Sequence, residues 1–364
     1  MSKVNPQINL SKKPKKDGGT GSYESGGTTF TVIKNDTGLP KGFFRHVHKP
    51  LNGPITLDRT LATSGDQIRG GFTGKKISSI DNVNEVSVYY WDGNDNVPIL
   101  LGITTENGNP EKTKYHGRSG PGNPWMNGFV LSLSEKQALD NQNCHNNNTV
   151  VFNIQNPEFG TLNENSKISN CIRGKIKTSY IKLPSLPGSN YTIKEYAING
   201  DASISRVTYG GRSTGITLNK GGGIDKVRVY FSAGSIEVPL LVEFLQRGGG
   251  ESEWHYTQNT DGRNWTEVGK EKSKTFYSGP DQPTENLTTE LDQIACSIGI
   301  GVTLDISYRN SETHARQSKK YCCDNHKDRV TVASGKINTG NHGHIMYYQH
   351  TIGQRYNLAA IKYH

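Results

Sequence analysis

The segment Val86-Ser-Val-Tyr-Tyr-Trp91 decides the fold of this chain, together with its near-copy Val227-Arg-Val-Tyr-Phe231. In both segments alternate positions are apolar, which is the pattern of a strand that turns one face to a core. Each segment passes through a glycine-containing loop into a second apolar run that opens with proline. Two apolar runs joined in this way predict a β-hairpin, because a strand can begin at proline without losing a needed hydrogen bond.

The hairpin belongs to a longer internal repeat, in which matched residues are separated by 141 positions, as 86 and 227 are. These residues are Val86, Val88, Tyr89, Tyr90, Gly93, Pro98, Ile99, Leu100 and Tyr115, which return as Val227, Val229, Tyr230, Phe231, Gly234, Pro239, Leu240, Leu241 and Tyr256. Further along, the separation becomes 152 for Leu139, Asp140, Cys144, Val150, Phe152, Ile154 and Cys171, which return as Leu291, Asp292, Cys296, Val302, Leu304, Ile306 and Cys323. A constant separation over this many positions does not arise by chance, so the chain is a tandem array.

Each copy is predicted to contain one short helix ahead of its first repeated cysteine. Ser134 and Gln137 have the spacing of a capping box, in which each side chain bonds the other residue's backbone. Asn286 takes the cap position in the second copy.

A shorter block of three strands occurs three times, at about 29–60, 170–218 and 326–364. Short strands at regular spacing with polar turns indicate an all-β protein with two tandem β-sandwich-like domains, each with one short helix. The predicted divisions are a disordered basic tail at 1–28, an extra N-terminal β segment at 29–78, and repeat domains at 79–218 and 219–364. The alternative, in which each short block belongs to the longer block that follows it, stays open.

The cysteines favour two equivalent disulfides. Cys144 and Cys171 are 27 residues apart, as are Cys296 and Cys323. A spacing kept between copies is what a bond of fixed geometry produces, whereas buried free thiols are the alternative. Disulfides predict a secreted, surface or exported protein. The first residues lack the apolar core of a secretory signal, so a cytoplasmic location is the alternative, and the state of Cys322 stays open.

The formal net charge is +9, and the basic residues are spread along the chain apart from a run at Lys12–Lys16. No recognition motif accompanies this charge, so the sequence does not favour a nucleic-acid partner. No stretch approaches the ~18 apolar residues of a membrane helix.

Motifs that carry chemistry are not matched. The glycine clusters lack the lysine of a phosphate loop, and neither a nucleophile elbow nor a zinc-protease motif occurs. A metal site built from Cys322, Cys323, His326, His342 and His344 does not match the ligand spacing of zinc modules. We therefore expect no catalytic residue, no metal and no cofactor.

Aromatic side chains are the remaining candidates for recognition, because aromatics on the polar face of a strand bind sugars and proteins. The alternative is that they fill the cores, since an internal repeat retains folding determinants first. The candidates are Tyr89, Trp91, Trp125, Tyr230 and Trp265.

The Val-x-Val-Tyr-Tyr-Trp run, Pro98-Ile-Leu-Leu, the Leu-Asp…Cys segment and the stretch from Tyr321 to Val332 resemble a multicopy set of piroplasm (Theileria-type) parasite proteins with tandem β repeats. The resemblance covers most of residues 29–364 and implies a lineage-specific, host-facing protein. It carries over no functional residues.

These observations predict a non-enzymatic tandem β-domain protein for host-facing recognition, adhesion or immune evasion, with a protein or glycan ligand. The alternative is a carbohydrate- or anion-binding module that uses exposed aromatics and the positive charge. A polar pocket with convergent histidines and carboxylates in one copy alone would point to an enzyme.

Overall fold

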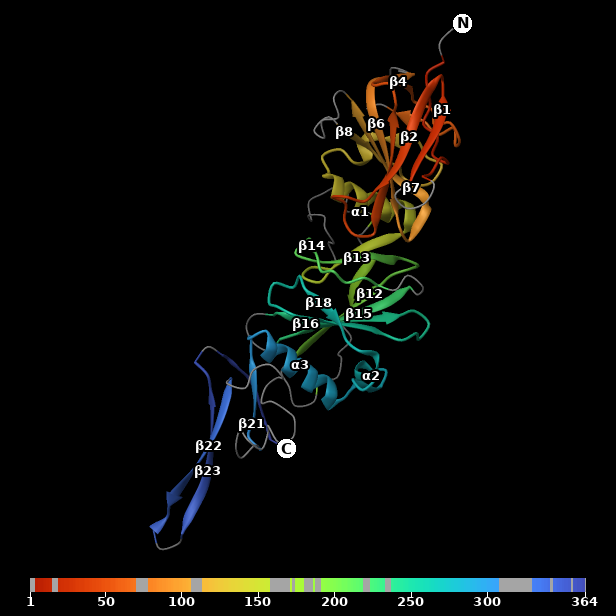
Figure 1. The fold of residues 1–364 in the computed structure, drawn as a ribbon. Coiled ribbons are helices and arrows are strands. Elements are labelled where there is room, and N and C mark those ends of the chain that lie inside the picture. Colours follow the sequence, from red (N-terminus) through yellow and green to blue (C-terminus); the bar gives the residue numbers. More distant parts are fainter. Residues whose placement is uncertain are drawn as a thin grey trace. The chain divides into compact units, whose positions relative to one another are not determined.

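The structure is a computed structural model that describes residues 4–14, 19–69, 78–105, 113–157, 171, 174–179, 186, 191–218, 223–232, 237–307, 329–340, 343–354 and 356–363. Strands dominate these residues, and the helices among them are short, which confirms the all-β class (Figure 1). They are α1 (Glu135–Asn147), α2 (Lys270–Ser273), α3 (Glu285–Ser297) and the 3-10 turn η2 (Asn127–Phe129). None of the described helices is long and apolar enough to cross a membrane.

The first sheet is built around the predicted hairpin. Its strands run in the order β1-β2-β3-β6-β7-β8, and β4 also pairs with β6. Their bounds are β1 (Thr20–Ser25), β2 (Thr28–Asn35), β3 (Phe43–Pro50), β4 (Ile55–Asp58), β6 (Ser79–Trp91), β7 (Asn94–Thr105) and β8 (Thr113–His116). The alternation predicted for β6 is confirmed, because Val86, Val88 and Tyr90 enter one core and Tyr89 enters the other.

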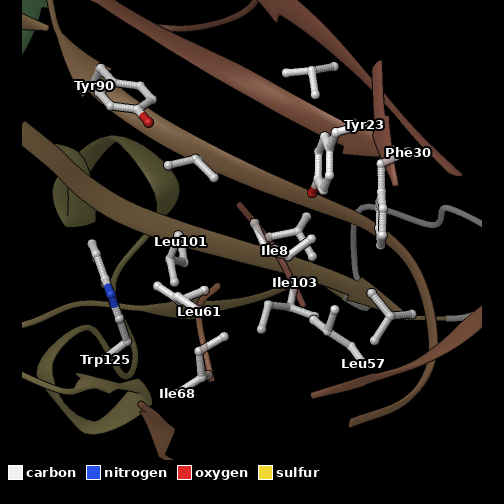
Figure 2. Packing of buried hydrophobic residues seen from close by; sticks show 14 of the residues in the cluster. Ile8, Tyr23, Phe30, Leu57, Leu61, Ile68, Tyr90, Leu101, Ile103 and Trp125 are labelled. Carbon is white, nitrogen blue, oxygen red and sulfur yellow. The ribbon is translucent and has the colours of Figure 1, made fainter. Parts of the chain in front are cut away.

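One face of this sheet packs on the N-terminal segment and on the short strands β5 (Ile68–Arg69) and β9 (Trp125–Met126). Figure 2 shows Ile8, Leu57, Leu61 and Trp125 in this core. Ile8 is fully buried, and its carbonyl oxygen accepts a hydrogen bond from Ala62 N at 2.9 Å. The prediction of a disordered tail over 1–28 is therefore wrong for residues 4–14, where Ile8 is buried, and for β1, which pairs with β2.

Helix α1 covers the other face of the first sheet, where Ala138 and Leu139 pack on Phe43, Tyr89 and Leu100. The capping box is confirmed: Ser134 Oγ accepts from Gln137 N, and the Gln137 side chain accepts from Ser134 N. This layer is a helix, so the sandwich predicted from the sequence is not what covers this face.

The second sheet repeats the first. Its strands run in the order β11-β12-β15-β16-β17-β18. Their bounds are β11 (Ile176–Ser179), β12 (Thr192–Ile198), β15 (Ile224–Phe231), β16 (Pro239–Gln246), β17 (Glu253–Thr257) and β18 (Trp265–Glu267). Helix α3 covers one face through Leu287, Leu291 and Ile294. Its N-cap is Thr284 rather than the predicted Asn286, which lies one residue inside the helix start.

The pairing of strands crosses both predicted domain boundaries. Strand β3 pairs with β6 across 78/79, and β12 pairs with β15 across 218/219. The first two short blocks therefore give their hairpins to the sheet of the longer block that follows, which is the grouping that the sequence left as the alternative. The predicted divisions at 78/79 and 218/219 do not coincide with the sheets, because a sheet is held by hydrogen bonds between strands, whatever their order in the chain.

In the second and third short blocks the remaining strand pairs with a strand of the longer block before it. Strand β13 (Ser203–Tyr209) pairs with β10 (Thr149–Asn153) and with β14 (Arg212–Ser213), and β24 (Leu358–Lys362) pairs with β21 (Val302–Asp305). As a result, one compact unit comprises Met1–Ile176 with Gly200–Arg206, and the other comprises Lys177–Asn199 with Val207–His364. The two-stranded sheets β19 (Tyr277–Gly279) with β20 (Gln282–Pro283) and β22 (Val330–Asn338) with β23 (His344–Ile352) belong to the second unit.

Candidate functional site

Three of the five predicted recognition aromatics are core residues. Tyr89, Trp125 and Tyr230 are fully buried, and each belongs to a different core (Figure 2 shows Trp125). Their strands turn them inward, so they offer no surface to a ligand. The prediction of an exposed platform does not hold for these three.

The other two aromatics are half-buried at turns. The Trp91 ring covers Gly93 in the β6–β7 turn, and any Cβ at Gly93 would lie 2.3 Å from it. The Trp265 indole N–H donates to Gly262 O at 2.7 Å. Both side chains are used in local packing, and they lie on different sheets.

The disulfide between Cys144 and Cys171 is present. Cys296 is also disulfide-bonded, and its predicted partner Cys323 lies outside the described residues, as does Cys322. The helix-borne cysteine of each repeat is therefore oxidised. His326 and His342 also lie outside the described residues, within which no cluster of histidines, cysteines or carboxylates could hold a metal ion.

The second sheet carries a row of buried charges across three strands. Glu195 on β12 lies opposite Arg228 on β15, and Arg228 lies opposite Glu243 on β16. Arg228 Nε donates to Glu195 Oε2 at 2.8 Å, and Arg228 Nη1 lies 3.6 Å from Glu243 Oε2. We call these three residues the charged row.

Further polar groups complete the coordination of the charged row. Arg228 Nη2 donates to Asp281 Oδ1 at 2.5 Å, and Lys226 Nζ lies 3.1 Å from Glu195 Oε1. The Tyr230 hydroxyl donates to Glu243 Oε2 at 3.0 Å. Charges are buried in proteins when they are paired and hydrogen-bonded in this way.

A cavity of about 320 Å³ opens onto the charged row. Arg228 and Glu243 line it together with the aromatic side chains of Trp254 and Tyr277. The other lining residues are mostly polar and comprise Leu245, Glu251, Ser252, Lys270, Ser273, Lys274, Gly279 and Pro280. The size and the mixture of aromatic and polar walls suit a small polar ligand.

The pKa values of three side chains that line the cavity differ from their ordinary values. Burial raises the pKa of Glu243 to about 7, although Arg228 and the Tyr230 hydrogen bond act against the rise. Burial and the Glu243 charge raise the pKa of Tyr277 to about 12. Burial lowers the pKa of Arg228, but the opposing effects of Glu243, Glu195 and the neighbouring tyrosines outweigh burial and leave it raised. The floor therefore keeps a cation beside a carboxyl group that is largely protonated in weak acid.

The first sheet has no such row at the matched positions. The residues opposite one another there are Val47, Ser87 and Gly102. A Cβ at Gly102 would lie 3.3 Å from the Tyr89 ring and 3.4 Å from the Tyr115 ring. These two rings fill the space that a longer side chain at Gly102 would need.

The repeat pattern does not reveal the charged row, because the row lies at positions where the two copies differ. The available signal was the opposite one, since Arg228 replaces Ser87 and Glu243 replaces Gly102 inside strands that otherwise match. These charged residues on one face of an otherwise apolar strand, present in one copy alone, are a departure from the repeat that the sequence shows.

No family model, no curated protein and no solved structure matches this chain.

Proposed function

We propose that this is a non-enzymatic recognition protein whose second repeat binds an acidic carbohydrate in the cavity over the charged row. The observation that carries the proposal is the cavity itself, which places Arg228 and Glu243 at its floor beside Trp254 and Tyr277. Aromatic faces pack on the apolar faces of sugar rings, and paired donors and acceptors satisfy the ring hydroxyls.

The rim supports a ligand with negative charge. Lys270 and Lys274 stand at the opening, and both are well exposed in their outer parts. Glu251 lies 3.5 Å from Lys270 Nζ and Glu271 lies 3.0 Å from Lys274 Nζ, so each lysine has an exposed partner that is easily exchanged. Exposed ion pairs are weak, and a carboxylate or sulfate on the ligand could replace these partners at little cost.

A binding role fits the internal contacts of the charged row better than turnover does. Both carboxylates of the row are held by Arg228, and Glu243 also accepts from Tyr230. A network engaged with itself gives a fixed floor for a ligand, which is the preorganisation that binding sites need.

The destination that we propose is outside the cell or at its surface, in a paralogous parasite family, where the protein would meet host glycans. The Cys144–Cys171 disulfide supports an oxidising compartment.

The test is an array of neutral and acidic glycans probed with the labelled full chain. We expect binding to glycans with carboxylates or sulfates, and a loss of at least tenfold in affinity for the double variant Lys270→Ala, Lys274→Ala. The matched control is Lys49→Ala, Lys336→Ala, which removes two exposed lysines elsewhere and should bind normally.

Silence on the whole array would overturn the binding proposal. Equal binding by both double variants would place the ligand elsewhere on the chain, and cleavage of a bound glycan would show that the cavity is an active site.

A further inference from the structure

The hairpin β22–β23 repeats two hairpins that join a following sheet. In β2–β3, Val32 lies opposite His48, and in β22–β23, Val332 lies opposite His350. Each histidine lies two residues before the end of its strand. His350 thus matches His48. The third member, β11–β12, matches β22–β23 at a separation of 154 residues, as 176 and 330 show.

In the first two hairpins the second strand pairs with the first strand of the next sheet. His48 of β3 lies opposite Val86, and Tyr196 of β12 lies opposite Val227. Val86 and Val227 are themselves matched positions of the repeat. The pairing of hairpin and acceptor strand therefore has the same register in both sheets.

The third hairpin and the strand that follows it contact the strand β21 that precedes them in the chain. Val330 and Val332 at its base pack on Val302 and Leu304 of β21, and the strand after it, β24, pairs with β21 as β13 pairs with β10. Among the residues that the structure describes, β22 and β23 form a sheet of two strands (the pair labelled β22 and β23 in Figure 1). What this hairpin lacks there is the acceptor strand.

The side chains that an acceptor sheet would bury are apolar and exposed. Phe43, Tyr191 and Ile345 occupy matched positions within one residue of the start of β3, β12 and β23. Phe43 is 3 % exposed and Tyr191 is 8 % exposed, whereas Ile345 is 59 % exposed. The exposed apolar residues of the same hairpin also include Ile337, Met346, Tyr347 and Tyr348.

Strand β23 also lacks the residues that proteins use to protect an open edge. Its sequence, His-Ile-Met-Tyr-Tyr-Gln-His-Thr-Ile, contains no lysine, no proline and no carboxylate. Charged residues and proline on an edge strand prevent pairing with other chains. An apolar edge strand without them favours the addition of a further strand.

We propose that β22–β23 is a donor hairpin that completes a further sheet of this repeat type, with β23 pairing in antiparallel fashion to that sheet's first strand. The register follows from β12 and β15: Tyr347 would lie opposite the position of Tyr230, and Gln349 opposite the position of Arg228. The hairpin would thereby add to the further sheet as β12 adds to β15. This inference does not depend on the cavity.

The probe is a capped synthetic peptide of residues 223–246, which contains the acceptor strand β15 and its partner β16. Added to the full chain, it should slow amide hydrogen exchange at least tenfold in residues 344–352 and leave β8 and β18, the outer edges of the two sheets, unchanged. A peptide N-methylated along the β15 edge should give no protection, because it cannot donate to β23.

The variant Ile345→Lys, Tyr347→Lys changes two exposed side chains, so it should fold normally and lose at least ten-fold in peptide affinity. Absence of protection in 344–352, or protection at β8 or β18 instead, would overturn the proposal. Self-association of the chain through β23 without peptide binding would also overturn it, since the occupant would then be a second copy of the hairpin.

Discussion

The two sheets share strand order, hairpin and helix, yet the same three cross-strand positions hold Val47, Ser87 and Gly102 in one and Glu195, Arg228 and Glu243 in the other. In the first sheet, the rings of Tyr89 and Tyr115 close over the glycine. In the second, the charged row forms the floor of a cavity.

The difference shows which residues the shared sheet-and-helix fold requires and which positions in it can vary. The apolar positions of β6 and β15 are kept because each sheet needs a core on both faces. The three cross-strand positions of the charged row can hold other residues, provided that any charges introduced there are paired with one another. The second repeat therefore carries the candidate site, and the first repeat has the same fold without that site.

The largest expected effect comes from removing the cation of the charged row. Arg228→Met leaves Glu195 and Glu243 buried without their shared partner, and should destabilise the second unit by about 3–5 kcal/mol. The measurement is guanidinium denaturation with hydrogen exchange to assign the unit affected. Lys226→Met is the matched control, and should cost about 1 kcal/mol or less because Lys226 is part-exposed.

The same row tests whether its members act as a unit. Replacing all three residues with apolar ones, Glu195→Val, Arg228→Met and Glu243→Leu, should recover most of the stability lost in Arg228→Met alone. Additive losses would show that the three charges do not form one network.

Breaking the disulfide of the first unit should come next in size. Closing the 27-residue loop between Cys144 and Cys171 contributes about 3–4 kcal/mol by constraining the unfolded chain. The double variant Cys144→Ser, Cys171→Ser should lower the denaturation midpoint of the first unit and leave that of the second unchanged. Equal shifts in both units would mean that their stabilities are coupled.

The first sheet should not tolerate a carboxylate at the position that Glu243 occupies in the second. Gly102→Glu puts a long charged side chain against Tyr89 and Tyr115, and should destabilise the first unit by about 3 kcal/mol. Gly102→Ala is the control, and should cost about 1 kcal/mol because its Cβ approaches those rings at 3.3 and 3.4 Å. A tolerated glutamate would show that the first sheet can also form the row.

The smallest expected effect is on the pH dependence of stability, which should have opposite signs for Glu243 in the second sheet and for His46 and His48 in the first. The raised pKa of Glu243, about 7 against 4.5, means that its stabilising contribution is present below pH 4.5 and is lost as pH rises through 7. Burial lowers the pKa of His46 to about 4 and that of His48 to about 3, so their contribution is present above pH 6.5 and is lost as pH falls through these values.

Denaturation midpoints of two variants at several pH values separate these contributions. Glu243→Gln should flatten the loss of stability between about pH 5 and pH 8, and His48→Asn should reduce the loss below about pH 6. If Glu243→Gln leaves the neutral limb unchanged, the carboxyl group is ionised throughout and the burial argument fails.

The structural features that are local or repeated could be predicted from the sequence, whereas those that depend on contacts distant in the chain could not. The β6–β7 and β15–β16 hairpins, the Ser134–Gln137 capping box and the Cys144–Cys171 bond are local or repeated features, so spacing alone identified them. Strand pairing across the predicted boundaries depends on contacts distant in the chain, and no periodic pattern reports it. Ile8 shows the same limit, since one apolar residue in a polar segment gives no period to detect.

The charged row and the donor hairpin depend on one structural claim, that the hairpins of the first two short blocks complete the sheets that follow them. Glu195 reaches Arg228 only because β12 pairs with β15.

Native-state hydrogen exchange of the Arg228→Met chain tests this claim most directly. We predict that the amides of β12, Thr192–Ile198, exchange faster together with those of β15 and β16, while Ser203–Arg206 of β13 keeps the protection of the first unit. If β12 instead keeps its protection while β15 and β16 lose theirs, the hairpin belongs to the first unit and the claim is contradicted.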